Sequence, residues 1–142
     1  MVDISHKDST ERLAIAQALV EVGSLATIDA IKQGNVPKGD VFEMSKAAGL
    51  LGVKKTADLL PDCHPLPIEY TAIEYAIDGM VIRIDVTVKT HYKTGVEVEA
   101  MHGASIVALN MYDMLKPIDK NVVIREIKLL KKTGGKSDID HS

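Results

Sequence analysis

Residues 68–89 read IEYTAIEYAIDGMVIRIDVTVK, and this stretch decides the fold. Over residues 82–89, apolar side chains alternate with polar ones, which is the period-two pattern of a strand with one buried face. Residues 68–77 form another β-rich run, and Asp78-Gly79 between the two runs is a hairpin turn signal. The stretch therefore predicts two antiparallel strands joined by a tight turn.

The chain before this hairpin contains one ambiguous segment and two predicted helices. Residues 12–22, RLAIAQALVEV, alternate as a strand does, but their alanines also favour a helix, so both interpretations stay open. Residues 24–34 predict a helix with a serine N-cap and a glycine stop. A second helical region is predicted over residues 40–60, capped by its first residue, with a bend at Gly49 and Gly52.

The chain after the hairpin predicts a long helix and a last strand. The helix should run from Thr94 to about Lys116, because Thr94 and Glu97 have capping-box spacing and Pro117 ends it. One apolar stripe and a weaker second one favour a helix packed on two sides, with subunit contacts. Residues 121–130 form the strand. If the ambiguous segment is a strand, the order of elements is β-αα-β-β-α-β. This order predicts an α+β fold, the ferredoxin-like split βαβ sandwich, in which helices pack on one face of an antiparallel sheet.

Length and composition limit the class of protein. The 142 residues suit one domain, with a mobile arm at 1–10 and a flexible tail at 134–142. One cysteine excludes an intrachain disulfide framework, and neither a signal peptide nor a membrane-spanning run is recognisable. The net charge of −3 argues against nucleic-acid binding through a broad basic face. We therefore expect a cytoplasmic protein that binds neither nucleic acid nor membrane.

Asp113 and Lys116 lie in the last turn of the predicted long helix. An aspartate there faces the negative end of the helix dipole, which costs about 0.3–1 kcal/mol. The spacing by itself favours an i,i+3 surface salt bridge, and the functional alternative is an acid/base pair. Glu99 is 14 residues from Asp113 on the same helix, so about 21 Å separates them. If both serve one site, the ligand is large or two subunits contribute.

Two further motifs have a plain and a functional interpretation. Cys63 and His64 are adjacent, so their side chains point apart in an extended chain. The histidines do not have the spacing of metal ligands, so we expect no metal site. His64 by itself suits a structural loop as well as a cleft. Residues 135–137, GKS, resemble the end of a phosphate-binding P-loop, but Leu130 stands where that motif needs glycine. They form either a flap over phosphates or a solvated tail.

Six motifs in order along nearly the whole chain resemble those of the molybdenum cofactor biosynthesis protein C family. The motifs are KGDV (38–41), KKT (54–56), CHPLP (63–67), KTGVEVEA (93–100), YDMLK (112–116) and GGKS (134–137). The resemblance implies a lyase that converts 3′,8-cyclo-7,8-dihydro-GTP to cyclic pyranopterin monophosphate and releases pyrophosphate, without a protein-bound cofactor. It also implies a ferredoxin-like fold, a homohexamer built as a trimer of dimers with active sites between subunits, and an upstream radical S-adenosylmethionine enzyme.

The same resemblance assigns roles to single residues. It makes Asp113 and Lys116 the catalytic pair. It assigns substrate binding to Asp62, Cys63, His64, Val98, Glu99, Lys38 and Lys132. Asp62 replaces a usual apolar residue and adds negative charge near a polyphosphate, and Val98 replaces a usual methionine. A non-catalytic purine-nucleotide module and a structural assembly protein are the rival interpretations, which product formation from the cyclic intermediate separates.

Overall fold

The computed structural model describes residues 1–142 and contains one five-stranded sheet and four helices. In chain order the elements are β1 (Thr10–Glu21), α1 (Leu25–Gln33), α2 (Val41–Lys54), α3 (Thr56–Leu59), β2 (Tyr70–Asp78), β3 (Val81–Tyr92), α4 (Glu97–Leu115), β4 (Val123–Thr133) and β5 (Ile139–Asp140). None of the helices has both the length and the apolar character needed to cross a membrane.

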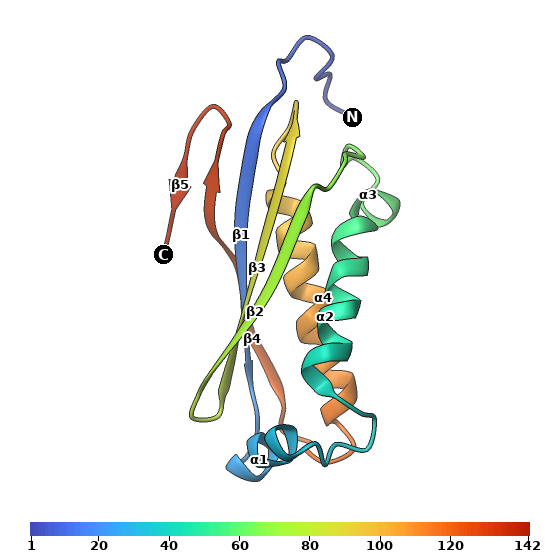
Figure 1. The fold of residues 1–142 in the computed structure, drawn as a ribbon, viewed down its shortest axis with the longest axis vertical. Helices are drawn as coiled ribbons and strands as arrows, with labels where there is room; N and C mark the ends of the chain where they lie inside the picture. The colour runs from blue at the N-terminus through green and yellow to red at the C-terminus, as the bar shows by residue number, and fades with distance from the viewer.

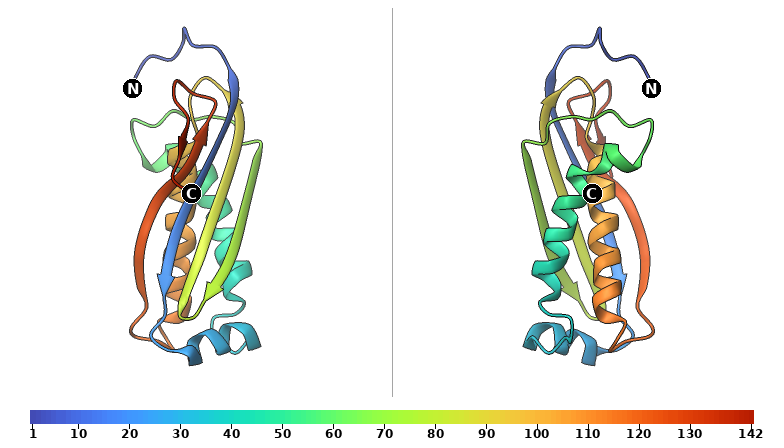
Figure 2. Two further views of the ribbon diagram at one scale, coloured as in Figure 1. Left: turned by 90° about the vertical axis from the view of Figure 1, so that its left-hand side faces the viewer. Right: turned by 90° about the vertical axis from the view of Figure 1, so that its right-hand side faces the viewer.

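The strands lie in the order β2-β3-β1-β4-β5, and each neighbouring pair is antiparallel. The helices α2 and α4 run side by side along one face of the sheet, and α1 lies at its lower end (Figures 1 and 2). The predicted hairpin is β2–β3, and its turn contains Gly79 at a φ of +60°, a value that favours glycine. The first four strands have ferredoxin-like order and connectivity, which confirms the predicted fold class.

The ambiguous segment at residues 12–22 forms most of β1, in the centre of the sheet. Ala14, Ala16 and Ala18 have no exposed surface and share one face of this strand. Their period-two spacing matches the alternation of β3, to which β1 is paired throughout its length. Small side chains at these positions let α4 lie close to the sheet, so the alanines serve packing and not helix formation.

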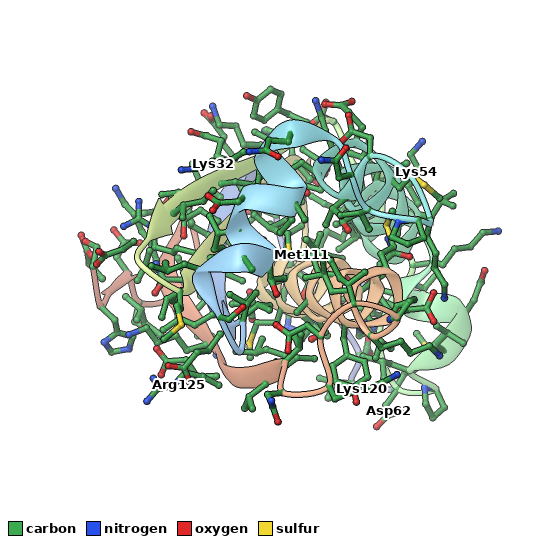
Figure 3. All side chains as sticks on the ribbon, turned by 90° about the horizontal axis from the view of Figure 1, so that it is seen from below. Lys32, Lys54, Asp62, Met111, Lys120 and Arg125 are labelled. Carbon is green, nitrogen blue, oxygen red and sulfur yellow. The ribbon has the colours of Figure 1, made fainter.

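The helix α4 supplies a large part of the core. Its main predicted stripe is buried throughout, at Val96, Ala100, Gly103, Val107, Met111 and Met114. In the weaker stripe Ala108 and Leu115 are buried, whereas Val98 and Tyr112 are 39% and 40% exposed. Figure 3 shows Met111 in the interior and the labelled lysines at the periphery. A single chain therefore covers α4 on two sides along only part of its length.

The predicted capping box at the start of α4 does not form. The helix begins at Glu97, and its N-cap, Val96, makes no side-chain capping bond. The Glu97 carboxylate pairs instead with Lys132 of β4, with 3.2 Å between Oε1 and Nζ. The Glu97 side chain, which the capping box requires, therefore forms an ion pair with a residue distant in the sequence instead of capping the helix.

The predicted bend at Gly49 and Gly52 is also wrong, because α2 runs unbroken through both residues. A Cβ atom on Gly49 would collide with Cγ2 of Val107, and one on Gly52 would lie 2.8 Å from Cγ1 of Ile106. These glycines allow α2 to pack closely on α4, and the helical region breaks at Lys55 instead.

The two ends of the chain lie against the folded core. The strand β4 continues to Thr133, and residues 134–142 turn back so that β5 pairs with Lys131 and Lys132. At the other end, residues 1–5 lie beside the loop that contains His64 (Figure 1). The upper end of the sheet therefore gathers both terminal segments.

Candidate active site

Asp113 lies between two lysines at the C-terminal end of α4. Its carboxylate oxygens are 3.1 Å from Nζ of Lys38 and 3.2 Å from Nζ of Lys116. Lys38 comes from the loop between α1 and α2, which reaches the same lower end of the molecule. We call Lys38, Asp113 and Lys116 the lysine cluster. All three side chains are between 39% and 53% exposed, so a ligand has access to them.

The electrostatics of the lysine cluster keep its carboxylate ionised. Hydrogen bonds from Lys38 and then Lys116 hold the pKa of Asp113 below its ordinary value. A groove of about 470 Å³ opens beside the cluster, lined by Ile106, Leu109, Asn110, Tyr112, Asp113 and Lys116. The spacing alone favoured a salt bridge between Asp113 and Lys116; the structure shows that bridge, adds a second cation and sets it beside an open groove.

A second group of polar side chains lies at the N-terminal end of α4. Sγ of Cys63 donates to Oε2 of Glu99 over 3.4 Å, and Glu99 is only 3% exposed. Burial raises the pKa of Glu99, and burial together with the nearby Glu99 carboxylate raises the pKa of Cys63 to about 11. His64 and Glu99 both line a cavity of about 90 Å³. This end of the helix therefore holds a neutral thiol beside a carboxyl group with an increased affinity for a proton.

The ion pair between Glu97 and Lys132 lies at this same end of α4. Lys132 is opposite Ala14 in the sheet register, which places it on the helix-covered face. Oε2 of Glu97 is buried without a hydrogen-bond partner, and it lies so close to Gly95 that a Cβ atom there would collide with it. We call Cys63, His64, Glu97, Glu99 and Lys132 the thiol cluster.

Three of the predicted binding residues face outward or toward the N-terminal arm. Asp62 is exposed, and its carboxylate is 2.9 Å from the amino group of Met1. Nε2 of His64 is 2.7 Å from the carbonyl oxygen of Val2. Val98 is 39% exposed on the outer side of α4. Asp62 and Val98 therefore lie at the rim of the thiol cluster rather than within it.

The predicted site residues form two groups, and one chain does not unite them. Asp113 and Glu99 are 14 residues apart on the single helix α4, which corresponds to about 21 Å. Asp113 lies near the C-terminal end of α4, which is at the lower end of the molecule in Figure 1, and Glu99 lies near the N-terminal end of α4, which is at the upper end. No group of three or more His, Cys, Asp or Glu side chains is placed to hold a metal ion.

Sequence reasoning missed two charged residues of the upper end. Glu97 was assigned to helix capping, and its partner Lys132 is distant in sequence. Arg12 was not singled out, although it is only 6% exposed. Its position in the alternating pattern Arg12, Ala14, Ala16 places it on the buried face of β1, and that pattern was a usable signal.

Comparison with known proteins gives one consistent result. The model of the MoaC family matches residues 1–135 of this chain. A cyclic pyranopterin monophosphate synthase of Clostridium perfringens (strain 13) is 49% identical over 139 residues, which cover 96% of this chain and 87% of that protein. Proteins of the same name from Nostoc sp. and Lysinibacillus sphaericus are 48% and 45% identical, covering 96% of this chain and 82% and 88% of the relatives.

Proposed function

This chain belongs to the MoaC family, and from that premise we propose that it synthesises cyclic pyranopterin monophosphate. It is an enzyme of molybdenum cofactor biosynthesis and acts on a small molecule. Its reaction is that of a lyase, which converts 3′,8-cyclo-7,8-dihydro-GTP to the cyclic monophosphate and releases pyrophosphate. An upstream radical S-adenosylmethionine enzyme supplies the substrate, and both steps take place in the cytoplasm. Residues 1–142 act as one catalytic domain.

The observation that carries the proposed roles is the placement of Asp113 between Lys38 and Lys116. The rearrangement moves several protons, so it needs a base and an acid within reach of the same substrate atoms. The lowered pKa keeps Asp113 ionised at neutral pH, where it accepts a proton. Lys116 donates one, and Lys38 stabilises negative charge that develops on the substrate.

The thiol cluster provides the binding side of the site. The Cys63 and His64 side chains and the Glu99 carboxyl group offer donors and acceptors that suit the edge of a purine-derived ring. Lys132 carries a positive charge for the phosphates. Asp62 at the rim places a negative charge near the entrance, so it tunes substrate affinity without taking part in the chemistry. Val98 contributes an apolar contact.

We place the complete site between two chains, because one chain keeps the two clusters about 21 Å apart. The outer faces of α2, α3 and α4 expose large apolar side chains, with Leu51 at 59%, Leu59 at 64% and Leu109 at 56%. Leu51 and Leu59 also line an apolar groove of about 270 Å³. Surfaces of this kind indicate association. A second copy of the chain packed there, within a homohexamer built as a trimer of dimers, brings the lysine cluster of one subunit toward the thiol cluster of another.

A product assay tests this function. The cyclic intermediate is generated enzymatically and given to the purified chain, and cyclic pyranopterin monophosphate and pyrophosphate are measured together. Wild-type chain should form both in equal amounts, whereas Lys116→Ala should form neither while keeping its fold. The exposed pair Glu21 and Arg125, 3.3 Å apart, offers the matched control, since Arg125→Gln removes an ion pair outside both clusters. Near-normal turnover by folded Lys116→Ala would contradict the assignment.

A further inference from the structure

Asn110 lies on α4 in the wall of the groove beside the lysine cluster, and its side-chain amide is held in one orientation. Its Nδ2 donates to Oγ of Ser45 on α2 over 3.1 Å and lies 3.4 Å from Sδ of Met114. A thioether sulfur accepts hydrogen bonds but cannot donate them, so the amino group of the amide, not its carbonyl, faces Met114. Ser45 and Met114 are 0% and 1% exposed. The amide is therefore anchored on its core side and cannot rotate without losing both contacts.

The carbonyl oxygen of the same amide has no partner. Oδ1 of Asn110 makes no hydrogen bond within the chain. It is not a buried atom, because Oε2 of Glu97 is the one side-chain polar atom that is both buried and unpartnered. Since Nδ2 points into the core and Asn110 lines the groove of about 470 Å³, Oδ1 faces that groove. The groove thus contains a neutral acceptor that is fixed in place before any ligand arrives.

The neighbours of this oxygen indicate which chemical group it suits. Asn110 is three residues before Asp113, so both side chains lie on one side of α4. The oxygens of Asp113 already face lysine donors, at 3.1 and 3.2 Å. A carbonyl oxygen binds an N–H or O–H donor and does not favour phosphate oxygens, which are themselves acceptors. Ile106 and Leu109 give the same groove an apolar wall that suits a ring. The features together describe a subsite for a base or a sugar.

We propose that Asn110 determines substrate specificity, because its Oδ1 accepts a hydrogen bond from the exocyclic amino group or a ribose hydroxyl of the purine-derived substrate. This inference rests on the proposed function and adds a residue to the lysine cluster's side of the site. Asn110 has no proton to transfer, so it binds and orients the substrate while Asp113 and Lys116 carry out the chemistry. A fixed acceptor beside them holds the reacting atoms in the geometry that proton transfer needs.

Steady-state kinetics with the cyclic substrate test this contact. Asn110→Leu has a similar size but lacks the acceptor, so KM should rise about three- to tenfold with a smaller effect on kcat, as for a neutral hydrogen bond made before and during the reaction. Ser45→Ala keeps Asn110 but frees its amide to rotate, so KM should rise less. Ser105→Ala is the matched control and should behave as wild type. It removes a hydroxyl of the same helix that bonds the Met101 carbonyl outside the groove.

Binding of nucleotide analogues identifies the donor group. GTP has the purine, ribose and triphosphate of the cyclic substrate. Inosine triphosphate lacks the exocyclic amino group, and 2′-deoxy-GTP and 3′-deoxy-GTP each lack one ribose hydroxyl. In calorimetric titrations, wild-type chain should bind one of these analogues about three- to tenfold more weakly than GTP. Asn110→Leu should bind that analogue and GTP alike, because the donor has lost its partner. The analogue that loses its penalty shows whether the donor is the amino group or a hydroxyl.

A purely structural role for Asn110, or a contact with a second copy of the chain, gives a different result. Asn110→Leu would then change the melting temperature or the mass measured by light scattering, while KM and the discrimination among nucleotides stay at wild-type values. That outcome overturns the proposal, as does a wild-type chain that does not distinguish GTP from any of the three analogues. If Asn110→Leu does not fold, Ser45→Ala decides, and unchanged KM and discrimination in that variant also overturn it.

The product assay separates this inference from the proposed function. If wild-type chain forms cyclic pyranopterin monophosphate and Asn110→Leu keeps wild-type KM and discrimination, the inference fails alone. If wild-type chain forms no product while Asn110 governs discrimination among the nucleotides, the subsite stands and the proposed function fails.

Discussion

The contact between α2 and α4 gives a prediction whose size follows from the structure. At Gly103 the two helices nearly touch, and a Cβ atom there would lie 2.5 Å from Cγ2 of Val53 and 3.3 Å from Cγ1 of Val86. Carbon atoms pack at about 3.5–4.0 Å, so Gly103→Ala forces Val53 to move by about 1 Å. Overpacking of this kind costs about 1–3 kcal/mol, and alanine regains about 1 kcal/mol of helix propensity.

We therefore expect Gly103→Ala to lower the free energy of unfolding by about 1 kcal/mol, or the melting temperature by about 3–5 °C. Val53→Ala alone should lose about 2 kcal/mol by leaving a cavity. In the double variant the new methyl group occupies part of that space, so its loss should be smaller than the sum of the single losses by about 1 kcal/mol. Urea unfolding of the four proteins measures this cycle. A Gly103→Ala variant more stable than wild type, or additive single losses, would refute the packing argument.

Two further predictions concern buried carboxyl groups. Burial raises the pKa of Glu99, so the folded chain holds this proton more tightly than the unfolded chain does. The free energy of unfolding should therefore fall as pH rises through the folded pKa. Glu99→Gln should flatten that fall in urea unfolding measured between pH 4 and 8, and an unchanged slope would contradict the argument. Burial acts to raise the pKa of Asp119, but hydrogen bonds from Asn121, Thr27 and Gly23 outweigh it and lower the pKa. The ionised Asp119 carboxylate therefore stabilises the fold above about pH 4, and this contribution is lost in more acidic solution. Asp119→Asn should make the melting temperature less sensitive to acid, and a variant as acid-sensitive as wild type would contradict this.

Most of the fold followed from local patterns in the sequence. The alternation over residues 82–89 and the turn at Asp78-Gly79 predicted β3 and the hairpin, because strand period and turn chemistry agree there. Residues 12–22 stayed ambiguous because alanine serves both a helix and a tightly packed strand. Pairing with β3 and β4 decides between them, and those partners are distant in the sequence.

The wrong local predictions share one physical cause, which is tertiary contact. Glu97 has capping-box spacing, yet Lys132, 35 residues away, takes its carboxylate. Gly49 and Gly52 have the appearance of helix breakers, yet they are places where α4 approaches α2. A local rule was overridden in each case by a partner that only the folded chain supplies.

The candidate site was predictable in its residues but not in its arrangement. The dipole argument singled out Asp113 with Lys116, while Lys38 entered through the family resemblance alone, and the structure places all three together. Arg12 was missed because residues 12–22 stayed ambiguous between strand and helix, and only the strand interpretation places this arginine on the buried face with Ala14 and Ala16. The distance between the two ends of α4 was predicted from helix rise, and its consequence, a site shared between chains, remains a proposal.

Mixing two inactive variants tests the shared site most directly. Asp113→Asn damages only the lysine cluster and Glu99→Gln only the thiol cluster, so each homo-oligomer should be inactive. If each site takes one cluster from each of two chains, subunits exchanged in equal amounts should regain about a quarter of wild-type turnover, since that fraction of interfaces pairs two intact clusters. No recovery after verified subunit exchange would contradict a site built from two chains.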